Sequence, residues 1–316
     1  MNKYLYIVNP NAGSGRGLTA KKAITDFHKA NDSPYKIIVT ELAKHATQIA
    51  KENSNSFSHI IACGGDGTIN EVINGIVRTR NVIFSVLPIG TGNDLIKSMN
   101  FPNNLLESLS IIHSDNKSKI ISTDLGLLEY TNNNSDLVHS HYFANCLGIG
   151  FDAYVGFINS TNKRLNGVSS YVVAVLKALY NYKMLDSNIK FNSHLNNSLD
   201  ISGEKLMFTV GKGISSGGGF YLTPNARLDD RLLDISIFDK VSRFRLLQVL
   251  PKALVNRLGT VKESRMYKTK NLQLTLKVPY YVHCDGEIVS KDLVSAKISC
   301  VENALKVIVN KNYLEA

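Results

Sequence analysis

Residues 64–68, with the sequence Gly-Gly-Asp-Gly-Thr, constrain the fold of this chain more than any other segment. They follow the apolar run 59–63, which is typical of a buried strand, and precede residues 69–76, whose apolar spacing is typical of a helix. In parallel α/β sheets, a strand followed by glycines and a helix start presents backbone N–H groups to a phosphate. Glycines let the backbone approach an anion that a Cβ atom would keep away. The segment therefore predicts a phosphate-binding loop.

A plain helix start is the alternative interpretation of the same residues. Thr68 as the N-cap and Glu71 three residues later would form a capping box. That interpretation leaves Gly64, Gly65 and Asp66 without a role. A carboxylate inside a phosphate loop is consistent with a metal ion or a hydroxyl partner beside the phosphate. The sequence favours the phosphate-binding interpretation.

Composition describes an ordinary globular protein with room for two domains. Of the 316 residues, 44% are hydrophobic and 20% are charged. The N-terminus runs into a strand-like segment at 4–8 without the pattern of a signal peptide, and no apolar run approaches the length of a membrane span. The four cysteines lie far apart and show no C-x-x-C pairing, which indicates free thiols rather than zinc ligands or disulfides. We expect a cytoplasmic protein.

The net charge of +10 is concentrated in residues 240–270, which carry nine basic side chains against one acid, Glu263. A solvated face is the default explanation of such a run, and nucleic acid or an anionic membrane is the alternative. Apolar residues near helical spacing between the charges suit a basic amphipathic helix at a bilayer surface better than a nucleic-acid groove. They are Phe244, Leu246, Leu247, Leu250 and Leu254. We expect peripheral contact with an anionic membrane through residues 240–270 and no nucleic-acid partner.

Up to about residue 122, strand-like and helix-like segments alternate. This rhythm predicts an α/β domain over residues 1–122, a doubly wound, Rossmann-like parallel sheet with helices on both faces that binds a nucleotide. The expected strands are 4–8, 35–40, 59–63 and 82–87, and the expected helices are 19–30, 45–53, 69–77 and 94–99.

After Ser122, short β-rich runs dominate, separated by polar turns rich in asparagine. This pattern predicts an antiparallel β-sandwich or barrel-like domain over residues 123–299, interrupted by one helix near 169–181. The last residues, about 300–316, can return to the first domain. The expected strands are 123–130, 141–147, 189–191, 205–210, 233–238, 272–277 and 280–284.

Three loops of the first domain share one pattern. Residues 8–17, 64–68 and 87–94 each follow a predicted strand and contain glycines. The carboxyl ends of parallel strands lie at one edge of a sheet, where open α/β proteins bind ligands. The first loop is not a Walker A motif, because no Gly-Lys-Ser/Thr ending follows, and it fails the dinucleotide fingerprint at Ala20. This argues against hydride transfer and leaves open a nucleoside triphosphate held by another type of glycine loop.

Taken together, the motifs resemble the bacterial diacylglycerol kinase catalytic-domain family of soluble lipid kinases. The likeness covers nearly the whole chain in the right order. The glycine–aspartate loop alone also occurs in NAD kinases and phosphofructokinase-like enzymes, whereas the ensemble is specific to the lipid kinases. The matching segments are Asn9-Pro10 with Gly13, Gly64 to Thr68, Pro88 to Asp94, Asn145 with Gly148, Gly150 and Asp152, Gly217 to Gly219, Pro224 to Asp234, and Asp285-Gly286-Glu287.

The resemblance implies ATP and Mg²⁺ as cofactors. Asp66, Asp94 and Asp124 match acids of the polar network around the catalytic magnesium. Glu287 matches the catalytic base, and Asp66 and Asp285 complete the implied catalytic set. The positions that correspond to nucleotide-binding residues are Asn9, Pro10, Asn11, Ala12, Gly13, Ser14, Thr40, Gly65, Asp66, Gly67, Thr68, Ile69, Asn70, Glu71, Thr91 and Asn93.

A second Mg²⁺ site, structural in the family, is implied at the paired aspartates. Asp230 matches the carboxylate ligand, and the carbonyls of Arg227 and Leu232 match the other two protein ligands. Where the family has glycine after the aspartates, this chain has Arg231, which must follow a turn that favours glycine. Adjacent acids before a buried strand also suit a hard cation, and a plain turn is the alternative.

The position of Glu287 suggests a chemical role apart from the resemblance. Phosphoryl transfer to an alcohol needs positioning, charge neutralisation and a carboxylate that accepts the hydroxyl proton. Glu287 follows a tight Asp285-Gly286 turn after a strand, which is a rigid place from which to aim one carboxylate. The alternative is a hairpin turn with Glu287 opening the next strand. The histidines show no ligand spacing, and we expect no catalytic role for them.

Two classes of function are consistent with these residues. The first is an ATP- and Mg²⁺-dependent kinase that phosphorylates the free hydroxyl of diacylglycerol, or of a related membrane lipid, to phosphatidate at the inner face of the membrane. A homodimer is compatible with this function. A NAD kinase-like phosphotransferase is the rival enzyme, and the loop 87–94 and the Asp285–Glu287 motif count against it. A non-catalytic nucleotide- or lipid-binding module is the rival outside enzymes, and the intact glycine loops count against that.

Overall fold

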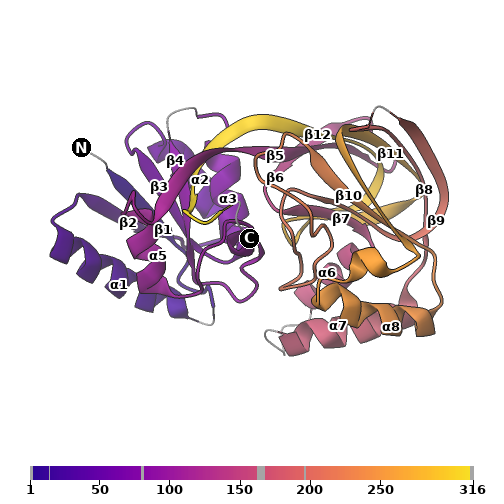
Figure 1. Ribbon diagram of the computed structural model, residues 1–316, viewed down its shortest axis with the longest axis horizontal. Helices are drawn as coiled ribbons and strands as arrows, with labels where there is room; N and C mark the ends of the chain where they lie inside the picture. The colour runs from indigo at the N-terminus through magenta and orange to yellow at the C-terminus, as the bar shows by residue number, and fades with distance from the viewer. Residues whose placement is uncertain (1–2, 14, 80–81, 162–167, 196, 314–316) are drawn as a thin grey trace. The chain divides into compact units, whose positions relative to one another are not determined.

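The computed structural model describes residues 3–13, 15–79, 82–161, 168–195 and 197–313 (Figure 1). The chain forms two compact units. Unit 1 contains Met1–Asp124 and Glu302–Ala316, and unit 2 contains Leu125–Val301. Two long strands, β5 (Ser118–Asn132) and β12 (Glu287–Asn310), have residues in both units.

Unit 1 contains a parallel sheet in the order β2-β1-β3-β4-β12. Its first four strands in sequence are β1 (Tyr4–Val8), β2 (Tyr35–Val39), β3 (His59–Gly64) and β4 (Ile83–Pro88). Strands β1 and β3 are buried along their whole length, as their continuous apolar runs predict. The winding direction changes between β1 and β3, which is the position where such sheets bind ligands. The predicted doubly wound domain is confirmed.

Helices α1 (Arg16–Asn31) and α5 (Leu105–Ile112) pack together, as do α2 (His45–Asn53) and α3 (Asp66–Ile76) (Figure 1). The short helix α4 (Asp94–Ser98) follows β4. Helices α1 and α3 begin three residues before the predicted starts at 19 and 69, inside the glycine loops. Helix α5 was not predicted, although the side chain of its N-cap, Asn104, accepts a hydrogen bond from the Glu107 N–H at 3.0 Å, a capping signal visible in the sequence.

Unit 2 contains antiparallel strands that close on themselves. Strands β8 and β10 each pair with both β9 and β11, and β7 also pairs with β9 and β11. Inward-facing side chains such as Leu147, Phe208 and Leu274 form one buried core between them. This confirms the predicted β-sandwich. The strands are β6 (Val138–Phe143), β7 (Cys146–Gly150), β8 (Leu185–Ser193), β9 (Ser198–Gly211), β10 (Leu233–Asp239) and β11 (Ser264–Cys284).

Two strand predictions in unit 2 are wrong in detail. The predicted strand 141–147 is interrupted because the N–H groups of Ala144 and Asn145 donate to the Asp285 carboxylate, each at 2.9 Å, rather than to a neighbouring strand. The predicted strands 272–277 and 280–284 form one strand, β11, whose register with β12 shifts between them.

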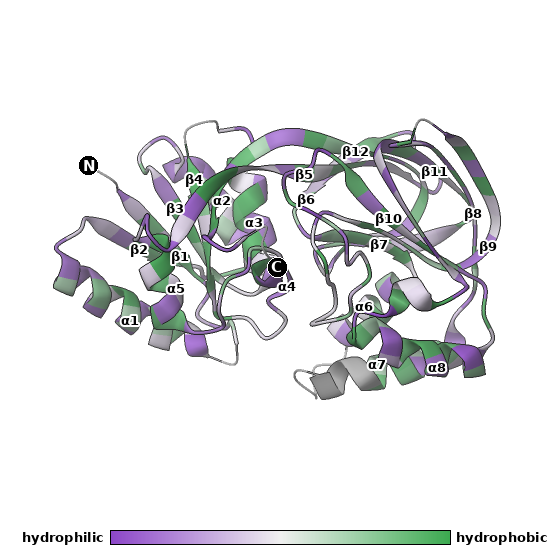
Figure 2. Cartoon of the chain, viewed as in Figure 1, coloured by the Kyte–Doolittle hydropathy of each residue, from purple (hydrophilic) through white to green (hydrophobic). Residues whose placement is uncertain are grey.

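In the described part of unit 2, three α-helices lie against the strands. Helix α6 (Phe151–Thr161) was not predicted, α7 (Val168–Asn181) matches the predicted helix near 169–181, and α8 (Arg243–Leu254) lies in the basic segment. Apolar residues of these helices form a second core with strands β9 and β10. Figure 2 shows apolar and polar residues alternating along α8, which agrees with its buried Leu246, Val249 and Ala253.

The cysteines are free thiols, as predicted, and Cys63, Cys146 and Cys284 are buried. Among the described residues, no helix is long and apolar enough to cross a membrane.

Candidate active site

The three glycine loops of unit 1 are joined by hydrogen bonds. The Asn9 N–H donates to the Cys63 carbonyl at 2.9 Å, and the Gly90 N–H donates to the Gly64 carbonyl at 3.1 Å. The guanidinium of Arg16 donates to the carbonyls of Gly13 at 3.2 Å and Gly90 at 2.9 Å. The carboxyl ends of β1, β3 and β4 therefore form one continuous surface, as predicted. Arg16 was not singled out from the sequence, where nothing distinguishes it from other exposed arginines.

Two of the glycines are required by close packing between the loops. A Cβ atom on Gly13 would lie 2.0 Å from the Ile89 carbonyl oxygen, and Gly13 has a φ of 57°. A Cβ atom on Gly90 would lie 2.5 Å from the Gly65 Cα atom. Gly65 differs, because its φ is −91° and its own Cβ atom would meet nothing closer than 3.5 Å. The fold of unit 1 alone gives no steric reason for glycine at position 65.

Thr68 and Glu71 have separate structural roles, so the capping-box alternative is wrong. Helix α3 begins after Gly65, which provides no side-chain cap. The Thr68 hydroxyl accepts a hydrogen bond from the Asn9 amide at 3.0 Å and so links two loops. The Glu71 carboxylate accepts from the N–H groups of Lys44 at 2.9 Å and Ala46 at 3.1 Å, at the start of α2. It therefore stabilises the N-terminus of a neighbouring helix.

The first turns of α1 and α3 face the loop surface without a side-chain cap. The first N–H groups of a helix have no partner inside the helix, and the helix dipole adds positive potential there. Such an end binds phosphate groups. The arrangement suits an anion held by backbone N–H groups.

The acids of the predicted magnesium network are each held by a defined contact. Asp66 Oδ1 accepts from the Asp94 N–H at 2.9 Å, and Asp94 pairs with Lys97 at 3.0 Å. Asp124 is buried and accepts from the Asn303 N–H at 2.9 Å. Within the described ranges, no group of three or more His, Cys, Asp or Glu side chains is arranged to hold a metal ion.

The other nucleotide-binding candidates lie in or beside the same loops. Asn11 donates its N–H to the Asn9 side chain at 3.0 Å, and the Thr40 N–H donates to the Val8 carbonyl at 2.9 Å. Asn93 is buried in a left-handed conformation with a φ of 52°. Ser14 lies outside the described residues. The remaining candidates are Pro10, Ala12, Gly67, Ile69, Asn70 and Thr91, all within residues 8–17, 64–76 or 87–94.

In unit 2, Asp285 and Gly286 form a tight hairpin turn, and Glu287 opens β12. Both turn residues have positive φ values, 51° and 89°, and Glu287 pairs with Cys284 across the hairpin. Asp285 is buried, and its carboxylate accepts from three backbone N–H groups, those of residues 144–146, at 2.9 Å each. Glu287 is exposed. Glu287 is thus an exposed residue at the start of a strand, and Asp285 ties its hairpin to the loop at residues 144–146.

The sequence analysis missed a buried pair beside this hairpin. His283 Nε2 lies 3.4 Å from Asp152 Oδ2, and the Gly286 N–H donates to His283 Nδ1 at 3.3 Å. Nδ1 thus faces a backbone donor, and Nε2 faces the carboxylate. Asp152 also accepts from the Thr209 hydroxyl at 3.2 Å. The position of Asp152 in the family motif was the available signal, whereas His283 gave none.

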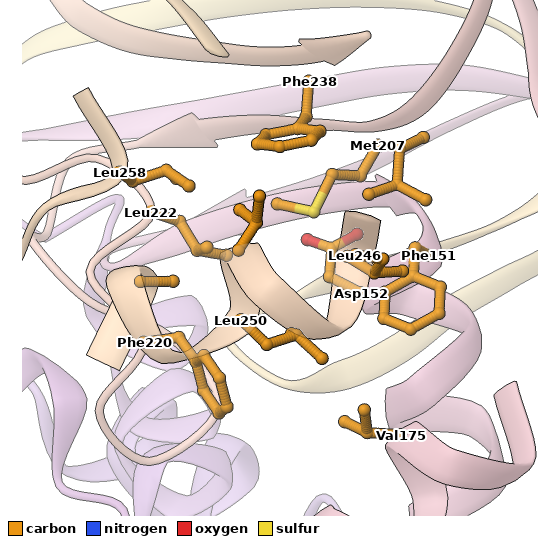
Figure 3. Close-up of a pocket in the computed structure, with 13 residues that line it drawn as sticks. Phe151, Asp152, Val175, Met207, Phe220, Leu222, Phe238, Leu246, Leu250 and Leu258 are labelled. Atoms are coloured by element: carbon orange, nitrogen blue, oxygen red, sulfur yellow. The ribbon is translucent and has the colours of Figure 1, made fainter. Parts of the chain in front are cut away.

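An apolar pocket lies in unit 2 between the helices and strands β9 and β10 (Figure 3). Leu246 and Leu250 of α8 and Val175 of α7 line it on the helical side, and Asp152 is the one acidic residue of the lining. The other lining residues are Phe151, Leu206, Met207, Phe220, Leu222, Phe238, Val249, Ala253 and Leu258. This composition suits a predominantly apolar ligand.

Comparison with known proteins matches each part of the chain to a family model. Residues 3–125 match the diacylglycerol kinase catalytic domain, and residues 145–309 match the YegS C-terminal NAD kinase beta sandwich-like domain. The chain belongs to the diacylglycerol kinase catalytic-domain family.

Individual relatives and solved structures are consistent with this family membership. A diacylglycerol kinase of Staphylococcus saprophyticus is 25% identical over 89% of this chain and 87% of its own length, and one of Staphylococcus haemolyticus is 27% identical over 72% and 64%. A crystal structure described as a diacylglycerol kinase from Bacillus anthracis superposes with a TM-score of 0.73 at 22% identity, covering 99% of this chain and 98% of that one. Yeast NADH kinase, with a TM-score of 0.55 at 11% identity over 99% of this chain and 86% of its own, shares the fold.

The Asp230 turn departs from what the family resemblance implies. Instead of offering free oxygens to Mg²⁺, the Asp230 carboxylate accepts from Lys212 Nζ at 3.0 Å and from Lys268 Nζ at 2.7 Å. Lys212 Nζ also donates to the Leu232 carbonyl at 2.8 Å. Two of the three groups that match metal ligands, Asp230 and the Leu232 carbonyl, thus already bind an ammonium group. The residues present do not fit the structural Mg²⁺ site.

Proposed function

We propose that this kinase transfers the γ-phosphoryl group of ATP to the free hydroxyl of diacylglycerol or a related membrane lipid, giving a phosphatidate and ADP. The observation that carries the proposal is the surface formed by the three linked glycine loops, at the point where the sheet changes its winding direction. It combines two uncapped helix starts with a glycine, Gly65, that the fold itself does not require. A polyphosphate would explain both features.

The acceptor is inferred from the pocket in unit 2. NAD carries a charged pyrophosphate, two hydroxylated riboses and a carboxamide, whereas this pocket is lined mostly by apolar residues such as leucine, valine, phenylalanine and methionine. An acyl chain matches such a lining, because burial of each CH₂ group contributes about 0.8 kcal/mol. Asp152, held by His283 and Thr209, places one hydrogen-bond acceptor in the lining. This favours a lipid alcohol over NAD as the acceptor.

In the proposed reaction, the lipid hydroxyl oxygen forms a bond to the γ-phosphorus as the bond to the bridging oxygen breaks, and ADP leaves with that electron pair. Glu287 accepts the hydroxyl proton as general base. Asp285 positions Glu287 by fixing the loop at residues 144–146. Mg²⁺ bound with ATP would neutralise phosphate charge, and Asp66 and Asp94 supply carboxylates of the type it prefers.

The substrate also requires contact with a bilayer, which we propose to be peripheral. At least four of the nine basic residues in 240–270 form ion pairs with acids, namely Lys240, Arg245, Arg265 and Lys268. The number of positive charges available to an anionic membrane is therefore smaller than the nine basic residues in the sequence suggest. Exposed Arg243, Arg257 and Lys262 still face solvent, each contributing about 1 kcal/mol near an anionic leaflet.

Apolar side chains stand beside these charges on α7 and α8. Phe244 is 72% exposed and Leu247 is 49% exposed, although Leu246 and Val249 of the same helix are buried. The Arg243 guanidinium donates to the Tyr180 carbonyl at 2.9 Å and lies over its ring, so the exposed Tyr180 of α7 adjoins this face. Apolar residues rimmed by arginine and lysine suit an anionic membrane surface.

Transfer of radiolabel from [γ-³²P]ATP to separate acceptors tests the proposal. The panel contains diacylglycerol, sphingosine, undecaprenol, phosphatidylglycerol and NAD. We expect label in the diacylglycerol product or in one other lipid. Label in NAD alone, or in no acceptor, would contradict the lipid kinase activity.

Vesicle sedimentation tests the membrane contact separately. Binding to phosphatidylglycerol vesicles should weaken steeply with added salt, and phosphatidylcholine vesicles should bind little. Replacing Arg243, Arg257 and Lys262 with Glu should reduce binding, whereas Lys277→Glu, at a surface ion pair with Asp186, should change it little. Equal binding by all variants would exclude the charge contribution.

A further inference from the structure

Lys212 is the most deeply buried cation in the surroundings of the Asp230 turn. It is the first residue after β9, and its side chain is 0% exposed. Its ammonium group donates to Asp230 Oδ1 at 3.0 Å and to the Leu232 carbonyl at 2.8 Å. A buried ammonium group is tolerated only where oxygens accept its protons and an acid balances its charge. The Asp230 turn supplies both.

A second cation, Lys268 of β11, completes the arrangement. Its ammonium group lies 2.7 Å from Asp230 Oδ2 and 3.1 Å from Asp234 Oδ2, and it donates to the Asn225 carbonyl at 3.1 Å. Both oxygens of the Asp230 carboxylate thus face an ammonium group. The two lysines and two aspartates balance in charge, so an added divalent cation would meet two positive charges at contact distance.

The ionisation states agree with this geometry. Burial raises the pKa of Asp230, but the hydrogen bond from Lys268 and the charge of Lys212 outweigh it and hold the pKa below its usual value. Burial lowers the pKa of Lys268, but hydrogen bonds and charges from Asp230 and Asp234 outweigh that and raise it. Asp230 and Lys268 are therefore both charged at neutral pH.

The turn itself has the left-handed conformation that a glycine would favour. Arg231 has a φ of 59°, a conformation that disfavours a residue with a Cβ atom. The Leu232 N–H also donates to Asp230 Oδ1 at 3.2 Å. The turn therefore keeps the shape that directs the Asp230 carboxylate and the Leu232 carbonyl to one point, and Lys212 Nζ occupies that point.

We propose that the Lys212 ammonium group replaces a structural divalent cation in this protein, so that the Asp230 turn is held by an internal salt bridge and binds no Mg²⁺. The inference does not rest on the proposed activity. It concerns the stability of unit 2 and is measured without nucleotide or lipid.

Thermal unfolding with and without metal tests the proposal. The wild-type Tm should be the same, within about 1 °C, in EDTA and in millimolar Mg²⁺, because a ligand that binds only the folded state raises stability by mass action and none binds here. Metal analysis of the dialysed wild type should find no bound Mg²⁺. A wild type that EDTA destabilises, or that keeps one Mg²⁺ per chain, would overturn the proposal even if no variant can be prepared.

Lys212→Asn supplies the complementary arm. It removes the ammonium group and leaves a short side chain with an oxygen beside Asp230, so the Tm should fall by several degrees, and Mg²⁺ should raise the Tm of this variant but not that of the wild type. Lys277→Asn, at the surface ion pair with Asp186, is the matched control and should resemble the wild type. A Lys212→Asn Tm equal to that of the control, or a destabilised variant on which Mg²⁺ has no effect, would show that Lys212 does not replace a cation.

Discussion

Asp66, in a glycine loop of unit 1, and Asp230, in a turn of unit 2, are two acids with opposite surroundings. Asp66 accepts a backbone N–H from Asp94 in a loop next to uncapped helix starts. Asp230 is enclosed by two lysine ammonium groups. An acid in a turn therefore does not by itself identify a metal site. The cations around it decide whether its charge is available to a ligand.

The matched pair Asp66→Asn and Asp230→Asn tests this difference most strongly. Asp66→Asn should reduce kcat by roughly 10²–10³-fold with little change in Tm, because the amide oxygen can still accept from the Asp94 N–H. Asp230→Asn should lower the free energy of unfolding by about 3 kcal/mol, because it leaves the buried Lys212 ammonium without a counter-charge, while kcat per folded molecule is kept. Initial rates and denaturant unfolding measure both. A loss of stability in Asp66→Asn together with a loss of kcat in Asp230→Asn would contradict these two roles.

Two glycines in the loops allow a finer test of the phosphate site. Gly90→Ala should lower the free energy of unfolding by roughly 1–3 kcal/mol, because the new Cβ atom would overlap Gly65. Gly65→Ala should leave stability within about 0.5 kcal/mol of wild type, yet weaken ATP binding at least tenfold by calorimetry, because only a ligand needs close approach there. Unchanged ATP affinity in Gly65→Ala would argue that no phosphate approaches this residue.

The apolar pocket of unit 2 has its own matched pair on α8. Leu250 lines the pocket, whereas Leu254, one turn later, is 49% exposed and does not. Leu250→Trp should reduce kcat/KM for a long-chain diacylglycerol by about tenfold, with a smaller effect on dioctanoylglycerol. Leu254→Trp should leave both rates near wild type. If Leu250→Trp affects both lipids equally, the pocket does not hold the distal part of the acyl chain.

A third polar arrangement, in unit 1, combines the buried Tyr6 and His28 with the partly buried His113, and it predicts a pH dependence of stability. Tyr6 Oη contacts His113 Nε2 at 2.7 Å and His28 Nε2 at 2.9 Å. Burial, with smaller contributions from the charges of His28 and His59, lowers the pKa of His113 from 6.5 to about 3. Burial also lowers the pKa values of His28 and His59.

Because these pKa values are lower in the folded state, the unfolded chain binds more protons below pH 6.5. Stability is therefore fully present above that pH and falls as the pH drops toward the folded values, by up to about 1.4 kcal/mol per pH unit for each histidine. Denaturant unfolding between pH 7 and pH 4 should show this slope, and it should be shallower in His113→Gln. The exposed His194→Gln is the control. Identical slopes in all three proteins would contradict this account.

The sequence was most informative where local signals are strong. Alternating apolar segments and glycine loops located the strands of unit 1 and the edge where its glycine loops meet, because each βα unit buries its own continuous run. The exact starts of α1 and α3 depend on loop conformation that those patterns do not encode. The interruption between β6 and β7 could not be predicted, since it follows from hydrogen bonds to Asp285, about 140 residues away.

The candidate sites show the same division between local motifs, which the sequence reveals, and long-range contacts, which it does not. The candidate loop residues could be named from contiguous motifs. By contrast, the hydrogen bonds of Arg16 to Gly13 and Gly90, the Asp152–His283 pair and the ion pairs of Asp230 with Lys212 and Lys268 arise from tertiary contacts. The unpaired positive charge of residues 240–270 was overestimated from the sequence for a similar reason, because acids outside this segment, such as Glu204 and Asp239, pair with basic residues inside it.

The central claim, phosphoryl transfer from ATP to a lipid alcohol with Glu287 as base, is tested most directly by competition in one reaction. Dioctanoylglycerol and NAD at equal concentration are incubated with limiting [γ-³²P]ATP and Mg²⁺, using wild type and Glu287→Gln in parallel, with ATP affinity measured for both. We predict label in the lipid product of the wild type and none above background with Glu287→Gln, whose ATP affinity is unchanged because the amide keeps the shape but accepts no proton. Label mainly in NAD, or equal lipid labelling by the two proteins, would contradict the account.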